Sequence, residues 1–96
     1  MNHEVKIVNQ REEANGTSFQ GYVETSYGQL VSAFGKSMKG SEDGKVNHQW
    51  IVKIDGILCT IYDYKENLNN GKVSDWHVGG KAKACVQMVK EVLDNE

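Results

Sequence analysis

His48 and Asp63 are the first residues whose types and spacing suggest chemistry. The dipeptide Asp55-Gly56 predicts a two-residue hairpin turn, and the register of that turn places His48 opposite Asp63. A carboxylate beside an imidazole orients the ring and raises its pKa, as in a general acid–base pair. A polar pair that closes the end of a hydrophobic core has the same pattern. Because the sequence places no nucleophile beside the pair, we favour the structural role and rank a small hydrolase-like enzyme last.

A second candidate is the segment WHVGGK at residues 76–81. We expect it to run into a helix over about residues 80–94, and paired glycines at a helix start let backbone amides approach an anion. Lys81 would add positive charge, and Trp76 would stack on a ring. This favours a nucleotide-signal sponge with the ligand-binding residues Gly79, Gly80 and Lys81. The plainer alternative is a glycine-rich helix start with Trp76 capping the core, and we prefer it because glycines before helices are frequent.

Tyrosines of the predicted hairpin form a third candidate, a protein-binding surface. The register turns Tyr62 and Tyr64 away from the face that carries Trp50, because side chains alternate along a strand. Tyrosine and tryptophan are favoured at binding hot spots. Either the two tyrosines are exposed, or the N-terminal strands or the second helix cover them. The predicted partner-binding residues are Tyr62, Tyr64, Trp76 and His77.

Metal and nucleotide motifs do not fit the chain. Cys59, Cys85, His48 and His77 lack the close ligand pairs of a structural zinc site. The segment 35–40 has the two glycines of a P-loop, but Ser41 stands where that motif needs lysine. We therefore expect no metal, no cofactor and no catalytic residue.

The elements that would position these residues give an α+β fold. A capping box at Ser26 and Gln29 begins an amphipathic helix over about residues 26–35. We expect a single domain over residues 1–96, with an antiparallel sheet around the central hairpin at 46–64 and both helices on one face. The segments 4–10 and 17–25 are further strands, and alternation places Phe19 and Tyr22 on opposite sides of the second.

Charge and composition limit the partners. The net charge is −2 and the pI about 5.9, which argues against direct nucleic-acid binding because that needs a basic surface. We expect no membrane partner, because no stretch is apolar enough to span a bilayer and the N-terminus lacks a signal peptide. A cytoplasmic location and two free thiols follow as expectations.

Two resemblances add to this picture. The segment 27–35, followed by a loop, Trp50 and a hairpin, resembles the helix–loop–sheet pattern of the β-lactamase-inhibitor-protein repeat, whose members bind proteins. The segments TIYDYK at 60–65 and WHVGG at 76–80 are similar to small uncharacterised proteins of bacteriophages. The second resemblance implies an inhibitor of host defences, including CRISPR systems, that acts in the cytoplasm of the bacterial cell.

The leading hypothesis is therefore a non-enzymatic, phage-type inhibitor that occludes a bacterial defence protein. A homodimer is also expected to be feasible, because an exposed sheet edge can pair with a second copy. The nucleotide-signal sponge and the enzyme remain as alternatives from other functional classes.

Overall fold

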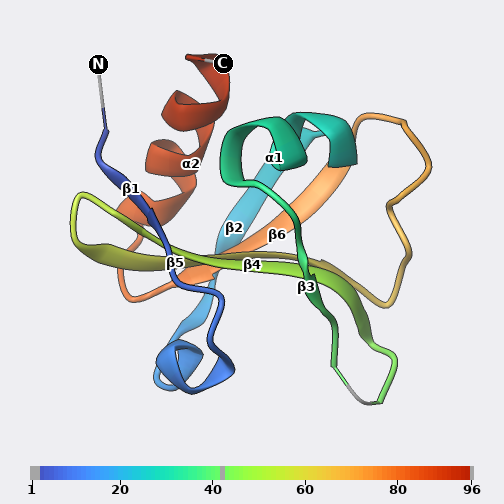
Figure 1. Cartoon of the computed structure of the whole chain (residues 1–96), viewed down its shortest axis with the longest axis horizontal. Helices are drawn as coiled ribbons and strands as arrows, with labels where there is room; N and C mark the ends of the chain where they lie inside the picture. The colour runs from blue at the N-terminus through green and yellow to red at the C-terminus, as the bar shows by residue number, and fades with distance from the viewer. Residues whose placement is uncertain (1–2, 42, 96) are drawn as a thin grey trace.

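The computed structural model describes residues 3–41 and 43–95 and confirms an α+β fold. One antiparallel sheet carries both helices on the same side (Figure 1). The part of the chain that is described holds no helix long and apolar enough to cross a membrane. Along the chain, the elements are β1 (Val5–Ile7), a 3₁₀ helix (Arg11–Ala14), β2 (Ser18–Thr25), α1 (Tyr27–Phe34), β3 (Met38–Lys39), β4 (Val46–Ile54), β5 (Ile57–Tyr64), β6 (Ser74–Gly80) and α2 (Ala84–Asp94).

The β4–β5 hairpin lies in the middle of the sheet, whose strand order is β1-β4-β5-β6-β2 with β3 also paired to β4. Asp55 and Gly56 form its turn with φ of 52° and 81°, the positive values that a tight hairpin turn needs. The predicted register is confirmed over most of the hairpin, with Trp50 opposite Ile61 and Ile54 opposite Ile57. The hairpin therefore decides which side chains face the helices.

The hydrophobic core fills the space between the sheet and the two helices. Trp50 is fully buried, and its indole N–H donates to the carbonyl of Gly35 at 2.8 Å. The Trp76 ring meets Trp50 edge to face, with 5.6 Å between ring centres. The predicted capping box of α1 is present, with the Gln29 N–H donating to the Ser26 hydroxyl. From α2, the buried side chains are those of Cys85, Met88, Val89 and Val92.

The opposite face of the sheet is only half covered. After β1 the chain folds over β4, where the N–H groups of Val8 and Asn9 both donate to the carbonyl of Ile51 at 2.9 Å. The 3₁₀ helix then contacts β4 and β5 on its way to β2. As a result Ile51, Leu58 and Thr60 are buried although they point away from the helices. The other half of this face carries no covering element among the described residues.

Two element boundaries differ from the sequence-based expectation. The segment 74–80 is strand β6, where we expected a polar loop followed by a helix start, and α2 begins only at Ala84. The first strand is also shorter than predicted, because the chain leaves the sheet at Val8 to cross β4. The extra strand β6 joins the hairpin to β2 and so creates the sheet's second half.

His3 links the hairpin turn to the last helix. Its ring nitrogens lie 2.5 Å from an Asp55 carboxylate oxygen and 2.8 Å from one of Glu91. The hydrogen bonds to Asp55 and then Glu91 raise the pKa of His3, and the same bonds lower the pKa of both carboxyl groups. The stabilisation from His3 is therefore complete below its ordinary pKa of about 6.5 and is lost as pH rises through the raised value. The carboxylates of Asp55 and Glu91 have the opposite pH dependence, because their contribution to stability is lost as pH falls through their lowered pKa values.

We predict that the melting temperature falls between pH 5.5 and pH 8.5 because His3 loses its proton, and that His3→Gln makes this fall smaller. Thermal unfolding of both proteins at the two pH values measures the difference. His77 has a lowered pKa and acts in the opposite direction, but it is present in both proteins and cancels. An equal fall in the two proteins would remove His3 as the cause.

Candidate functional site

Five aromatic rings gather on the uncovered half of the sheet, and we call them the aromatic cluster. They come from three neighbouring strands, and their side chains face away from both helices. Three of them are exposed large side chains: Phe19 at 50%, Tyr22 at 51% and Tyr64 at 38%. Aromatic rings exposed together are unusual on a small domain and mark interaction surfaces. The members of the aromatic cluster are Phe19, Tyr22, Tyr62, Tyr64 and His77.

His77 lies at the centre of the aromatic cluster and contacts the other four rings. Its cross-strand neighbours are Tyr62 on β5 and Tyr22 on β2. The Tyr62 ring stacks on the imidazole with 5.2 Å between centres and 25° between planes, and Tyr22 meets it edge-on at 4.9 Å. Phe19 and Tyr64 approach at 5.4 and 5.6 Å. Contacts of this kind favour fixed orientations of the rings relative to one another.

A β-bulge brings Phe19 into the cluster. Strict alternation predicts Phe19 and Tyr22 on opposite faces, and that expectation is wrong. The β2–β6 register shifts between Phe19 and Gly21, and the two rings meet at 5.1 Å. An extra residue in one strand reverses the alternation beyond it. Gly21 permits the bulge, because a Cβ at this position would lie 3.0 Å from a Val86 methyl carbon and its φ is 159°.

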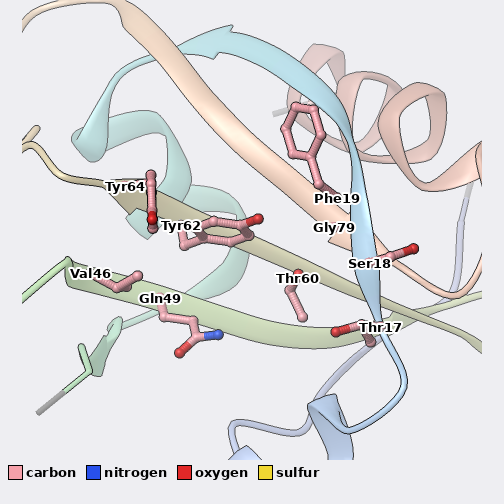
Figure 2. Close-up of a pocket in the computed structure, with 9 residues that line it drawn as sticks. All are labelled: Thr17, Ser18, Phe19, Val46, Gln49, Thr60, Tyr62, Tyr64 and Gly79. Atoms are coloured by element: carbon pink, nitrogen blue, oxygen red, sulfur yellow. The ribbon is translucent and has the colours of Figure 1, made fainter. Parts of the chain in front are cut away.

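The cluster surrounds a hollow of about 310 Å³ that is lined by its five rings. A second hollow of about 300 Å³ adjoins it and shares Phe19, Tyr62 and Tyr64 (Figure 2). In Figure 2 the Tyr62 ring lies over β5 between Tyr64 and Thr60, with Gln49 on one side and Phe19 on the other. The remaining lining of the second hollow is short or polar, from Thr17, Ser18, Val46, Gln49, Thr60 and Gly79.

The aromatic cluster contains no carboxylate, lysine or arginine side chain. Burial lowers the pKa of His77, which favours the uncharged imidazole at neutral pH. Burial, with a smaller effect from the Tyr22 and Tyr64 phenols, raises the pKa of Tyr62 and keeps its hydroxyl protonated. The hollow therefore offers ring faces and hydroxyl groups, and any charge must come from its rim.

His48 and Asp63 do not lie opposite each other as the turn register predicts, so the acid–base pair that was the less favoured alternative does not form. The β4–β5 register shifts between Val46 and Gln49, and one Asp63 oxygen accepts the backbone N–H groups of Asn47 and His48, each at 2.8 Å. The other oxygen accepts the N–H of Leu68 at 3.2 Å. Asp63 is fully buried, so its carboxylate holds the bulge and the loop after β5 together. The role of Asp63 is structural, and its carboxylate bonds to the backbone N–H of His48 and not to the imidazole ring.

Ser37 is the residue that the structure places beside His48, and no motif in the sequence predicts this contact. The Ser37 hydroxyl lies 3.3 Å from His48 Nδ1 and 3.5 Å from the Tyr27 hydroxyl, and the Tyr27 ring packs on the imidazole at 4.7 Å. The other imidazole nitrogen is buried and has no hydrogen-bond partner within residues 3–41 and 43–95. Among the described residues, no carboxylate bonds to this imidazole as a catalytic base would require. We interpret the group as polar packing beneath α1.

The helix start expected at Gly79 and Gly80 is wrong, because both glycines lie in β6, and the alternative of an anion site there loses the helix N-terminus on which it depended. Gly79 is opposite Thr60, and Gly80 is opposite Cys59. A Cβ would lie 2.6 Å from the Thr60 hydroxyl at the first position and 2.4 Å from Cys85 Sγ at the second. The glycines are therefore required by close packing. Lys81 follows the strand, and its N–H donates to the Leu58 carbonyl at 3.1 Å.

The four predicted partner-binding residues divide between the two faces. Tyr62, Tyr64 and His77 lie together in the aromatic cluster. Trp76 is fully buried against Trp50, so its placement in a binding surface is wrong. Adjacent residues of a strand point to opposite faces, and β6 therefore sends Trp76 inward and His77 outward.

The two cysteines are free and buried, as the sequence predicted. Burial raises the pKa of the Cys59 thiol, with a smaller effect from Cys85 beside it, which keeps it protonated and unreactive. Over the described residues, no three histidine, cysteine, aspartate or glutamate side chains gather as metal ligands.

No protein-family model, curated protein or solved structure matches the chain. The chemistry of the aromatic cluster must therefore be inferred from its own geometry and charge.

We predict that Asp63→Asn lowers the free energy of unfolding by about 2–3 kcal/mol, because one of the two acceptor oxygens becomes an NH2 donor and the buried backbone N–H that faces it loses its acceptor. Chemical denaturation measures the change. Asp94→Asn, at an exposed position near the end of α2, is the control and should change stability little. Wild-type stability in Asp63→Asn would contradict the structural role of this carboxylate.

We also predict opposite effects for alanine at two glycines. Gly80→Ala should destabilise the fold by about 2–3 kcal/mol, because the methyl group overlaps Cys85 Sγ and the Leu58 carbonyl. Gly28→Ala has open space around it in α1 and should stabilise by about 0.5 kcal/mol through helix propensity. The denaturant midpoints of the two variants measure these changes in stability. A wild-type midpoint for Gly80→Ala would refute the packing explanation.

Proposed function

We propose that this protein is a non-enzymatic binding protein and that the aromatic cluster is the surface on which a partner protein docks. The observation that carries the proposal is the set of five rings around a hollow on an uncovered sheet face. Tyrosine-rich clusters of this kind supply large contact area at a low cost in side-chain entropy. The rings are already held by one another and by a rigid sheet, which favours affinity through preorganisation.

A protein partner fits this surface better than a nucleic acid does. Rings that stack on nucleobases work together with a basic groove that follows the phosphate backbone. Neither hollow is lined by lysine or arginine, and the chain has a net charge of −2. Counterion release would therefore add little to nucleic-acid binding here.

The resemblance to small bacteriophage proteins extends the proposal to a bacterial defence protein as the partner, which binding would occlude. The aromatic cluster lies across three strands, so it is wide enough to cover part of another protein's working surface. A homodimer remains part of the proposal: β2 is an edge strand of the sheet, and its free backbone groups are available to a second copy.

We predict that Phe19→Ser combined with Tyr22→Ser lowers recovery of a captured partner at least about tenfold, since hot-spot side chains each contribute more than about 1 kcal/mol. The measurement is affinity capture from bacterial lysate on immobilised protein, followed by mass spectrometry. Ile7→Ser is the matched control, because Ile7 is 45% exposed on β1, apart from the cluster. Circular dichroism checks that all variants fold.

Partner recovery that falls equally in Ile7→Ser, or that survives the double substitution, would place the docking surface elsewhere. A protein that captures nothing reproducibly from lysates of several bacterial hosts would count against a bacterial partner.

A further inference from the structure

A pair of acidic residues adjoins the aromatic cluster on the same face. Glu24 on β2 stands directly opposite Asp75 on β6, one pair beyond the core pair of Val23 and Trp76. Both are exposed, and alternation places them on the face of Tyr22 and His77. Like charges directly opposite each other across two strands destabilise a sheet. The sheet therefore keeps an unfavourable pair two residues along β2 and β6 from Tyr22 and His77 of the aromatic cluster.

No cation within the described part of the chain forms an ion pair with Glu24 or Asp75. The ion pairs formed there involve Asp43, Asp55 and Glu91, and neither Glu24 nor Asp75 takes part. Lys90 lines a hollow of about 200 Å³ together with Glu24, Leu93 and Asp94, but it forms no ion pair with Glu24. The two carboxylates are therefore free to accept hydrogen bonds from outside the molecule.

One ring of the cluster already holds a cation. The Lys65 ammonium lies 5.4 Å from the centre of the Tyr64 ring, within the range of a cation–π contact. The remaining rings of the aromatic cluster have no such neighbour among the described residues. The surface thus combines ring faces that attract cations with a pair of carboxylates that needs one.

We propose that the partner inserts an arginine side chain into the aromatic cluster, with its guanidinium stacked on the rings and hydrogen-bonded to Glu24 and Asp75. This inference rests on the proposed function and adds the chemistry of the partner. Arginine fits better than lysine, because its planar group stacks on aromatic faces and its fork of N–H donors matches two carboxylates. The Lys65 ammonium over Tyr64 is a positive charge on one ring of the cluster, and the lowered pKa of His77 disfavours a second one at its centre.

The test titrates the isotope-labelled protein with N-acetyl-arginine methylamide at constant ionic strength and follows the ring signals by NMR. We expect saturable shifts of Tyr22, Tyr62 and His77, with a dissociation constant in the millimolar range expected for one side chain. The citrulline derivative has the same shape without the charge and should bind at least about fivefold more weakly. Equal binding of citrulline or of the lysine derivative would overturn the proposal, as would tighter binding of adenosine.

A charge variant separates binding from folding. Glu24→Gln with Asp75→Asn should weaken arginine binding at least about fivefold. The same variant should raise the melting temperature by about 1–5 °C, because the like-charge repulsion is gone. Glu12→Gln with Glu13→Gln removes the same charge from the exposed 3₁₀ helix and is the control, expected to bind arginine as wild type does. If both variants lose arginine affinity equally, the loss comes from the change in net charge, and the proposed site at Glu24 and Asp75 is refuted.

Failure of this inference is distinguishable from failure of the proposed function. If Phe19→Ser with Tyr22→Ser abolishes partner capture while Glu24→Gln with Asp75→Asn leaves capture unchanged, the surface binds a partner but not through arginine.

Discussion

The two-residue turn at Asp55 and Gly56 is the constraint on which the rest of the structure depends. Its positive φ angles fix the hairpin register, and a slip of one residue would exchange every inward and outward side chain. Asp55 is held further by the N–H of Glu4 at 2.9 Å and by His3, so the turn is pinned from the N-terminal side. With this register, the Ile61 side chain of β5 points toward the helices and the Tyr62 side chain points to the open face. The position of the aromatic cluster is a consequence of this register.

Local signals made much of the fold predictable from sequence. The hairpin depends on one dipeptide and the start of α1 on Ser26 and Gln29, and each of these acts within a few residues. Strand β6 was missed because Gly79 and Gly80 were interpreted as a helix start. The alternation of Trp76 and Val78 inward with Asp75 and His77 outward is a strand pattern that was available in the sequence.

The composition of the site could be predicted only in part, because two bulges control it. Tyr62, Tyr64 and His77 followed from alternation or local pattern, but Phe19 joins Tyr22 only through the bulge before Gly21. The other bulge, between Val46 and Gln49, separates His48 from Asp63 and turns a plausible acid–base pair into a carboxylate that holds backbone N–H groups. Both bulges depend on contacts between distant segments, which no short window of sequence contains.

The pairing of β2 with β6 joins strands that are far apart along the chain, whereas β4, β5 and β6 follow one another. Long loops are closed at an entropic cost that neighbouring strands avoid, so contact order favours early formation of the β4–β5–β6 meander and later docking of β2. Phe19 and Tyr22 belong to that late strand. The aromatic cluster is therefore completed only when β2 docks, and a partly folded chain that holds the β4–β5–β6 meander alone would present the tyrosines of β5 without Phe19 and Tyr22.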